Sequence, residues 1–220
     1  MTRSEHRPEC GGSGLQWLDD IAAWDGAVPA ALTALDLSRV AQRDLLRLMA
    51  ARVLGRPVAE VTILHREGRA PRIAAPNGTQ PGSPDLGLSL ASRGRFSALA
   101  VAAGRVGIDV EIVDPAGEVP WAVLHPRERS DLAALAGLER ASAFARLWTL
   151  KEAYLKACHW GLARDPAAFQ VRVLDETRAH IENPGEENPP GEATTIWRHA
   201  GGQVAAISVV LLADRPLPIR

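Results

Sequence analysis

Apolar positions recur along the chain at two different spacings, which predict three helices and several short strands. In residues 38–54, apolar side chains recur among arginines at helical spacing, and Gly55 and Pro57 end the pattern. The same spacing predicts helices at residues 128–138 and 141–158. Short apolar runs predict strands at residues 61–64, 88–90, 96–103, 106–110, 169–174, 194–198 and 203–212, with loops at 67–87 and 179–195.

The order of these elements repeats along the chain. Each half runs helix, strand, long loop and hairpin, and the apolar runs 96–101 and 204–209 occupy equivalent places. The expected fold class is therefore α/β (α+β), a pseudo-two-fold pair of similar lobes, each a helix packed on a small antiparallel sheet. After a disordered tail at residues 1–14, the lobes would span 15–105 and 106–220. They would form a single catalytic unit with its site in the cleft between them.

Composition narrows the class of protein. The formal net charge of −1 gives no general attraction for nucleic acid or for an anionic membrane. Cys10 and Cys158 have no metal-ligand spacing, so we expect two free thiols in a reducing compartment. The N-terminus lacks an apolar signal sequence, and the apolar runs fall short of the roughly 20 residues of a membrane helix. These features predict a cytoplasmic protein with neither a membrane nor a nucleic acid as partner.

Two short segments concentrate carboxylates and lysines. Asp109 and Glu111 are two residues apart in a predicted strand, so both side chains project from one face. Glu152 and Lys156 are four residues apart in a predicted helix and also share a face, with Lys151 beside them. Taken singly, these are ordinary surface carboxylates and a surface ion pair. Taken together, hard oxygen ligands beside ammonium groups indicate a site for Mg²⁺ and a diphosphate.

The residues around these groups carry a family resemblance. Gly-Ile-Asp-Val-Glu at 107–111, followed by Trp-Thr-Leu-Lys-Glu-Ala-Tyr-Leu-Lys at 148–156, resembles the paired motifs of the 4′-phosphopantetheinyl transferases. The similar type is the larger, monomeric one that activates surfactin synthetase and similar megasynthases of polyketide or nonribosomal peptide biosynthesis. The likeness runs from about Arg69 through Phe169-Gln170-Val171-Arg172 and is weak in the flanks.

The resemblance implies a fold of two lobes in one chain and a group-transfer reaction. The enzyme would be of the holo-[acyl-carrier-protein] synthase type. It would move the 4′-phosphopantetheine arm of coenzyme A to a serine of an apo acyl or peptidyl carrier protein, releasing 3′,5′-ADP. The reaction would require Mg²⁺, with Mn²⁺ as an alternative ion, and the protein would act as a monomer.

The resemblance also implies residue roles. Asp109, Glu111 and Glu152 would hold the metal, and Asp109, Glu152 and Lys156 are the expected catalytic residues. Lys151 and Lys156 would contact phosphates, and Lys156 would stabilise or protonate the leaving group. The base for the carrier serine stays open between Glu152 and a metal-bound water.

Two further features bear on the reaction, one carboxylate and one basic helix face. Glu128 is a third candidate base, although an acidic residue is also ordinary in a first helical turn. The arginines Arg39, Arg43 and Arg47 form a basic helix face, which is either plain solvated surface or a contact for coenzyme A or an acidic carrier protein.

The residues expected to bind the adenosine end of coenzyme A depart from the family pattern. Arg69 and Arg72 resemble the cation that binds the 3′-phosphate, and Ser89 belongs to the family's Ser-His-Ser stretch, but Leu90 stands where the histidine is expected. Arg93 or Arg95 is a candidate to compensate. This departure leaves two alternatives: a degenerate, non-catalytic member that binds a carrier domain or nucleotide, and another Mg²⁺-dependent transferase with a diphosphate donor.

Overall fold

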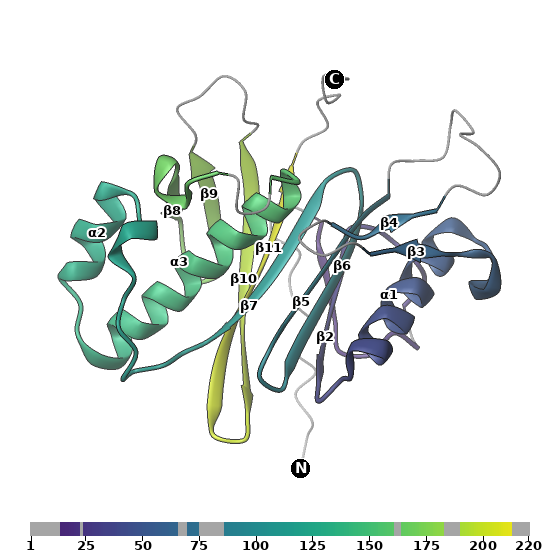
Figure 1. Ribbon diagram of the computed structural model, residues 1–220, viewed down its shortest axis with the longest axis horizontal. Coiled ribbons are helices and arrows are strands. Elements are labelled where there is room, and N and C mark those ends of the chain that lie inside the picture. The colour runs from purple at the N-terminus through teal and green to yellow at the C-terminus, as the bar shows by residue number, and fades with distance from the viewer. Residues whose placement is uncertain are drawn as a thin grey trace, which may run out of the picture.

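Two β-sheets pack face to face and carry one long helix on each outer face, so the computed structural model is layered helix, sheet, sheet, helix (Figure 1). Small and β-branched side chains fill the interface between the sheets. The structure describes residues 14–22, 24–65, 70–74, 86–160, 164–182 and 190–212. Apart from Gly14, the predicted tail therefore lies outside the described residues. In the described part of the chain, no helix is long and apolar enough to cross a membrane.

Four strands form the first sheet: β1 (Gln16–Leu18), β2 (Ala30–Leu35), β5 (Leu86–Arg93) and β6 (Phe96–Ala103). They lie in the order β1-β2-β6-β5, with β1 parallel to β2 and the other pairs antiparallel. Helix α1 (Arg39–Leu54) covers the outer face. It begins after the cap residue Ser38 and ends at Gly55, which is left-handed, as the sequence predicts. Beside it lie η1 (Val58–Glu60), β3 (Ile63–Leu64) and β4 (Arg72–Ile73).

Five strands form the second, fully antiparallel sheet: β7 (Val106–Ile112), β8 (Gln170–Val173), β9 (Arg178–Glu182), β10 (Gly191–Ala200) and β11 (Gln203–Leu212). They lie in the order β7-β11-β10-β9-β8, so β7 is an edge strand. Helix α3 (Gly137–Ala157) covers the outer face. The remaining elements are η2 (Trp121–Val123), α2 (Pro126–Ala133) and η4 (Pro166–Ala168).

The two sheets repeat one topology. The order β2-β6-β5 in the first sheet corresponds to β7-β11-β10 in the second, and each set consists of a strand, a covering helix and a later hairpin. The predicted fold class, two similar units of a helix on a small antiparallel sheet, is confirmed, and the apolar runs at 96–101 and 204–209 are the corresponding strands β6 and β11. The division into lobes at residues 105 and 106 stays a prediction.

Some predicted element boundaries are wrong. The predicted loop at 179–195 contains most of β9 and the start of β10, because Ala179 and Ile181 alternate inward in a stretch whose composition is otherwise typical of a loop. The predicted helix 128–138 is also wrong at its end, because α2 ends at Ala133 and residues 137 and 138 form the start of α3, which was predicted to begin at 141. Strands β1 and β2 were not predicted.

Candidate active site

Strand β7 presents its motif residues to α3 across a very short gap between the backbones. Ile108 and Val110 point into the interface between the sheets, whereas Asp109 points toward α3. At Gly107 a Cβ atom would lie 1.8 Å from the carbonyl oxygen of Ala153. Only a residue without a Cβ allows this approach, which brings the strand carboxylates to the helix. A glycine inside a strand pattern was the available sequence signal for this role.

Asp109, Glu152 and Lys156 meet where β7 and α3 touch. The Lys156 ammonium donates to Asp109 Oδ1 at 2.7 Å and to the carbonyl oxygen of Ile108 at 3.1 Å. Glu152 lies one helical turn before Lys156, and its carboxylate interacts electrostatically with both Asp109 and Lys156. The structure thus brings together the three predicted catalytic residues, although Glu152 and Lys156 lie 43 and 47 positions after Asp109 along the chain.

Burial disfavours the charge on both carboxylates. It raises the pKa of Asp109 above its ordinary value, and the nearby Lys156 opposes this only in part. Burial also raises the pKa of Glu152, and the negative charge of Asp109 adds to the increase. Asp109 and Glu152 therefore lie close together in a partly desolvated place. Binding of a cation or of a proton there offsets their negative charge.

Replacing Glu152 with Gln is expected to raise the thermal unfolding midpoint at about pH 8. In the wild type the folded state holds its proton more tightly than the unfolded state, so stability falls as the pH rises through the raised pKa. Gln carries no charge, so the Glu152→Gln protein does not lose stability in this way as the pH rises. The gain should disappear at about pH 4, where the wild-type carboxyl is protonated. A lower midpoint for Glu152→Gln at the higher pH contradicts this reading.

Glu111 shares the face of Asp109 but is held by a different cation. Its Oε1 accepts from Arg93 Nε at 2.9 Å and from the Ile112 amide at 2.9 Å. Among the described residues, no group of three or more His, Cys, Asp or Glu side chains gathers to hold a metal ion. Mg²⁺ is usually held by one or two carboxylates together with water and substrate phosphates. The donor chemistry of Asp109 and Glu152 fits such an ion, and Glu111 lies beside them in a pair with Arg93.

Lys151 points away from this group into the protein interior. Its side chain is 0% exposed, and its ammonium lies 3.0 Å from Glu128 Oε2 and donates to the carbonyl oxygens of Pro166 and Phe169 at 2.8 Å each. Burial lowers its pKa, and Glu128 opposes the shift. The structure therefore does not place Lys151 with the other predicted phosphate contacts.

Glu128 is equally enclosed. Besides Lys151, its carboxylate accepts from the backbone amides of His125 at 2.8 Å and Val171 at 2.7 Å. The bond to His125 closes the capping box of α2. Both oxygens are occupied inside the protein, so the structure argues against Glu128 as the base for a substrate.

The residues expected at the adenosine end are scattered or outside the described part. Arg69 lies outside the described residues, and Arg72 is exposed on β4, beside β5 (Figure 1). Ser89 is only 3% exposed, and its hydroxyl accepts from the Ile108 amide at 3.0 Å. Leu90, which replaces the family histidine, packs on the core beneath α1. Arg95 pairs with Asp36.

Three buried hydroxyls hold the middle of α3 to the sheet. Thr149 Oγ1 lies 2.7 Å from Ser208 Oγ, which in turn lies 2.9 Å from Thr195 Oγ1. Ser208 is the register partner of Asp109 on β11. These bonds tie the helix that carries Glu152 to the strand beside Asp109, and no pattern in the sequence predicted them.

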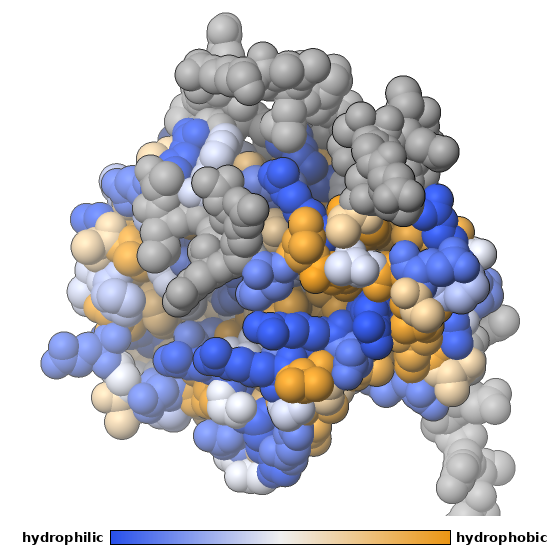
Figure 2. All heavy atoms as spheres, turned by 45° about the vertical axis from the view of Figure 1, so that its right-hand side comes forward, coloured by the Kyte–Doolittle hydropathy of each residue, from blue (hydrophilic) through white to orange (hydrophobic). Residues whose placement is uncertain are grey.

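A basic face on α1 lies on the other side of the molecule. Arg39 and Arg43 are exposed there, and Arg47 pairs with Asp44 at 3.4 Å. Val40, between them, is 66% exposed. Figure 2 turns this side of the molecule forward and shows hydrophilic side chains interspersed with hydrophobic patches. The face therefore offers both charge and apolar area to a partner.

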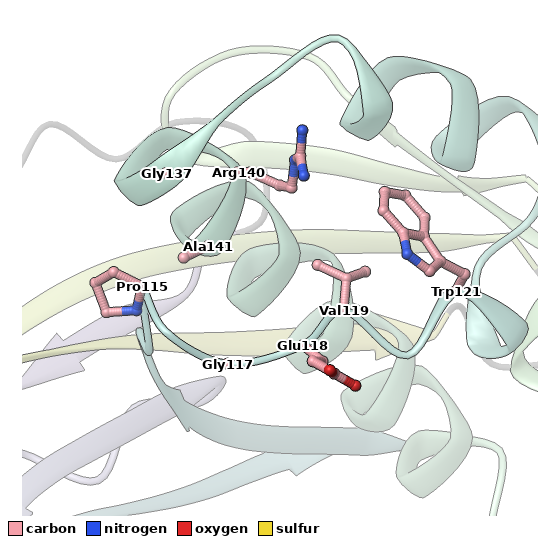
Figure 3. A pocket seen from close by; sticks show the side chains of 8 residues that line it. All are labelled: Pro115, Gly117, Glu118, Val119, Trp121, Gly137, Arg140 and Ala141. Atoms are coloured by element: carbon pink, nitrogen blue, oxygen red, sulfur yellow. The ribbon is translucent and has the colours of Figure 1, made fainter.

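A pocket of about 310 Å³ lies at the N-terminal end of α3 (Figure 3). It is lined by Pro115, Gly117, Glu118, Val119, Trp121, Gly137, Arg140 and Ala141. Trp121 and Arg140 lie on the same side of it, whereas the Glu118 carboxylate points the other way. None of the predicted site residues lines this pocket, and along the helix it lies roughly 16 Å from Glu152.

Comparison with known proteins matches the second half of the chain to one family. A model described as the 4′-phosphopantetheinyl transferase superfamily matches residues 105–208, which include both motifs. The chain is 30% identical over 146 residues to a 4′-phosphopantetheinyl transferase of Bacillus subtilis, covering 66% of this chain and 62% of that protein. It is also 30% identical over 110 residues to the 4′-phosphopantetheinyl transferase Sfp of Bacillus subtilis strain 168, covering 50% of this chain and 49% of that protein. The matches thus span about half to three fifths of the length of these relatives.

Proposed function

Because the chain belongs to the 4′-phosphopantetheinyl transferase superfamily, we propose that it transfers the phosphopantetheine arm of coenzyme A to a carrier protein. The acceptor is a serine of an apo acyl or peptidyl carrier protein, and the second product is 3′,5′-ADP. One observation carries the proposal: Asp109, Glu152 and Lys156 meet at the contact of β7 and α3. Two carboxylates beside an ammonium group suit a cation-bridged diphosphate.

Asp109 and Glu152 would hold Mg²⁺ or Mn²⁺, with Glu111 as the third predicted ligand. When bound, the ion neutralises diphosphate charge and makes 3′,5′-ADP a better leaving group. Lys156 would keep a positive charge beside the diphosphate, because Asp109 and the Ile108 carbonyl both accept from its ammonium and hold it next to the carboxylates. As the phosphorus–oxygen bond to the leaving group breaks, this ammonium stabilises the new charge on the released oxygen.

The serine hydroxyl must lose a proton as its oxygen bonds to phosphorus. Of the two carboxylates considered as bases, Glu128 has both oxygens bonded inside the protein. Glu128 is therefore set aside as the base. The proton would go to Glu152, which lies beside Asp109, or to a water held by the bound ion.

The proposed binding regions for coenzyme A and the carrier protein rest on positively charged side chains. Arg69 and Arg72 would bind the adenosine end of coenzyme A, since guanidinium groups suit phosphate. Carrier proteins of this kind are acidic, so the basic face of α1 with its exposed Val40 is a candidate docking surface. We expect the protein to act as a cytoplasmic monomer.

The test of this proposal is a transfer assay followed by intact mass spectrometry. The full chain is mixed with coenzyme A, Mg²⁺ and apo carrier proteins of the acyl and peptidyl types. The carrier should gain the mass of one phosphopantetheine, and 3′,5′-ADP should be released in equal amount. Measurable binding of carrier or nucleotide without any gain in mass would instead identify the degenerate, non-catalytic member that Leu90 suggests.

Asp109→Asn and Glu152→Gln should each lower the transfer rate by about 10²–10³-fold. Each change removes a ligand charge from the proposed cation and diphosphate site while keeping the shape of the side chain. The initial rate is read from the same mass spectra, and circular dichroism confirms the fold. Glu139→Gln is the matched control, because Glu139 is an exposed carboxylate in the first turn of α3. A wild-type rate for either site variant would overturn the assignment.

A further inference from the structure

On the free edge of β7, two side chains from other elements, Ser89 and Lys156, form hydrogen bonds with the backbone of Ile108. β7 pairs only with β11 among the described strands, and the amide and carbonyl of Ile108 point away from that partner. The Ile108 amide donates to Ser89 Oγ at 3.0 Å, and the Ile108 carbonyl accepts from Lys156 Nζ at 3.1 Å. Both outward polar groups of this residue are therefore satisfied, one from each side of the strand.

Ser89 makes its bond from the other sheet. It lies on β5, is only 3% exposed, and reaches the residue that directly precedes Asp109. The two strands approach closely along this edge, because a Cβ at Gly87 of β5 would lie 3.1 Å from Val106 Cγ1 of β7. The hydroxyl thus joins the first sheet to the strand that carries the site carboxylates.

We infer that Ser89 is a positioning residue that holds the backbone of Ile108, directly before Asp109, through its amide, rather than a ligand of the phosphate donor. This inference rests on the proposed function for its catalytic consequence, but not for the bond itself. Lys156 contacts both the Ile108 carbonyl and the Asp109 carboxylate, so a shift of the backbone at Ile108 moves the carboxylate and the ammonium relative to one another. Ser89 is only 3% exposed, so its hydroxyl has almost no surface with which to contact coenzyme A.

The test compares Ser89→Ala and Ser89→Cys with the wild type. Cys keeps the approximate volume of Ser but is a weak acceptor, so it separates loss of the bond from loss of packing. Ser92→Ala is the matched control, because Ser92 lies on the same strand with an exposed side chain. Amide hydrogen exchange of Ile108 is followed by NMR, and kcat and the KM for coenzyme A are measured in the transfer assay.

Exchange at Ile108 should become about tenfold faster in both Ser89 variants and stay unchanged in Ser92→Ala. The value of kcat should fall about tenfold, while the KM for coenzyme A stays within about twofold of the wild type. Unchanged exchange at Ile108 would overturn the inference, as would a raised KM with an unchanged kcat, which would make Ser89 a donor ligand. The exchange measurement needs no turnover, so it decides the role of the bond even if the proposed transfer fails.

Discussion

Gly107→Ala is expected to destabilise the protein by about 3 kcal/mol or more, because the added methyl group has no space. Its Cβ would lie 1.8 Å from the carbonyl oxygen of Ala153 and 2.7 Å from the amide nitrogen of Ala157. Both atoms are helix backbone, so relief requires α3 to move away from β7. The helix is anchored in a well-packed core, and that movement would open it.

The displacement of α3 should also lower the rate of the proposed transfer reaction. Glu152 and Lys156 travel with α3, whereas Asp109 stays with β7, so we expect transfer to fall by about 10²-fold. Urea unfolding and the mass-spectrometric assay measure the two effects. Gly117→Ala is the control, because the nearest atoms to its new Cβ belong to the flexible Asp114 side chain at 3.1 Å or more. A Gly107→Ala protein within about 1 kcal/mol of the wild type would show that α3 can retreat without cost.

Lys151→Met should lower the free energy of unfolding by about 3–5 kcal/mol. The change leaves the Glu128 carboxylate, which is 2% exposed, without its counter-charge. It also removes the donor from the carbonyl oxygens of Pro166 and Phe169. Equilibrium unfolding in urea at neutral pH gives the loss directly.

The double variant Lys151→Met with Glu128→Gln separates the two roles considered for Lys151. Gln is neutral, so no unpaired charge stays buried, and its one carbonyl oxygen can still accept from the His125 or the Val171 amide. We therefore expect the double variant to be more stable than Lys151→Met alone. If Lys151 serves only the interior, transfer should recover together with stability. Recovered stability with a KM for coenzyme A raised about tenfold would instead assign Lys151 to the phosphate, as the family resemblance implies.

Much of the candidate site was predictable because it depends on short-range geometry. Side chains two apart in a strand share a face, and side chains four apart in a helix do too. Asp109 with Glu111, and Glu152 with Lys156, follow from these periodicities alone. The helix boundaries at Ser38 and Gly55 were predictable for the same reason, since caps act within one turn.

The predictions that the structure does not support depend on contacts between different elements. The loop predicted at 179–195 is partly strand, because pairing with the hairpin strand β10 overrides a weak local preference. Neighbouring residues on a helix point about 100° apart, so Lys151 and Glu152 cannot face the same way. The motif joins them in sequence, while the helix sends Lys151 toward Glu128 and Glu152 toward β7.

The sequence by itself determined which groups are present and which of them share a face, because strand and helix periodicities are local. Only the tertiary structure decided how the faces meet. The contact of Gly107 with the backbone of Ala153 sets the distance between the carboxylate strand and the lysine helix. The bond from Ser89 to Ile108 and the enclosure of Lys151 by Glu128 join residues 19 and 23 positions apart. Such pairings arise from the packing of whole elements, and no local pattern in the chain records them.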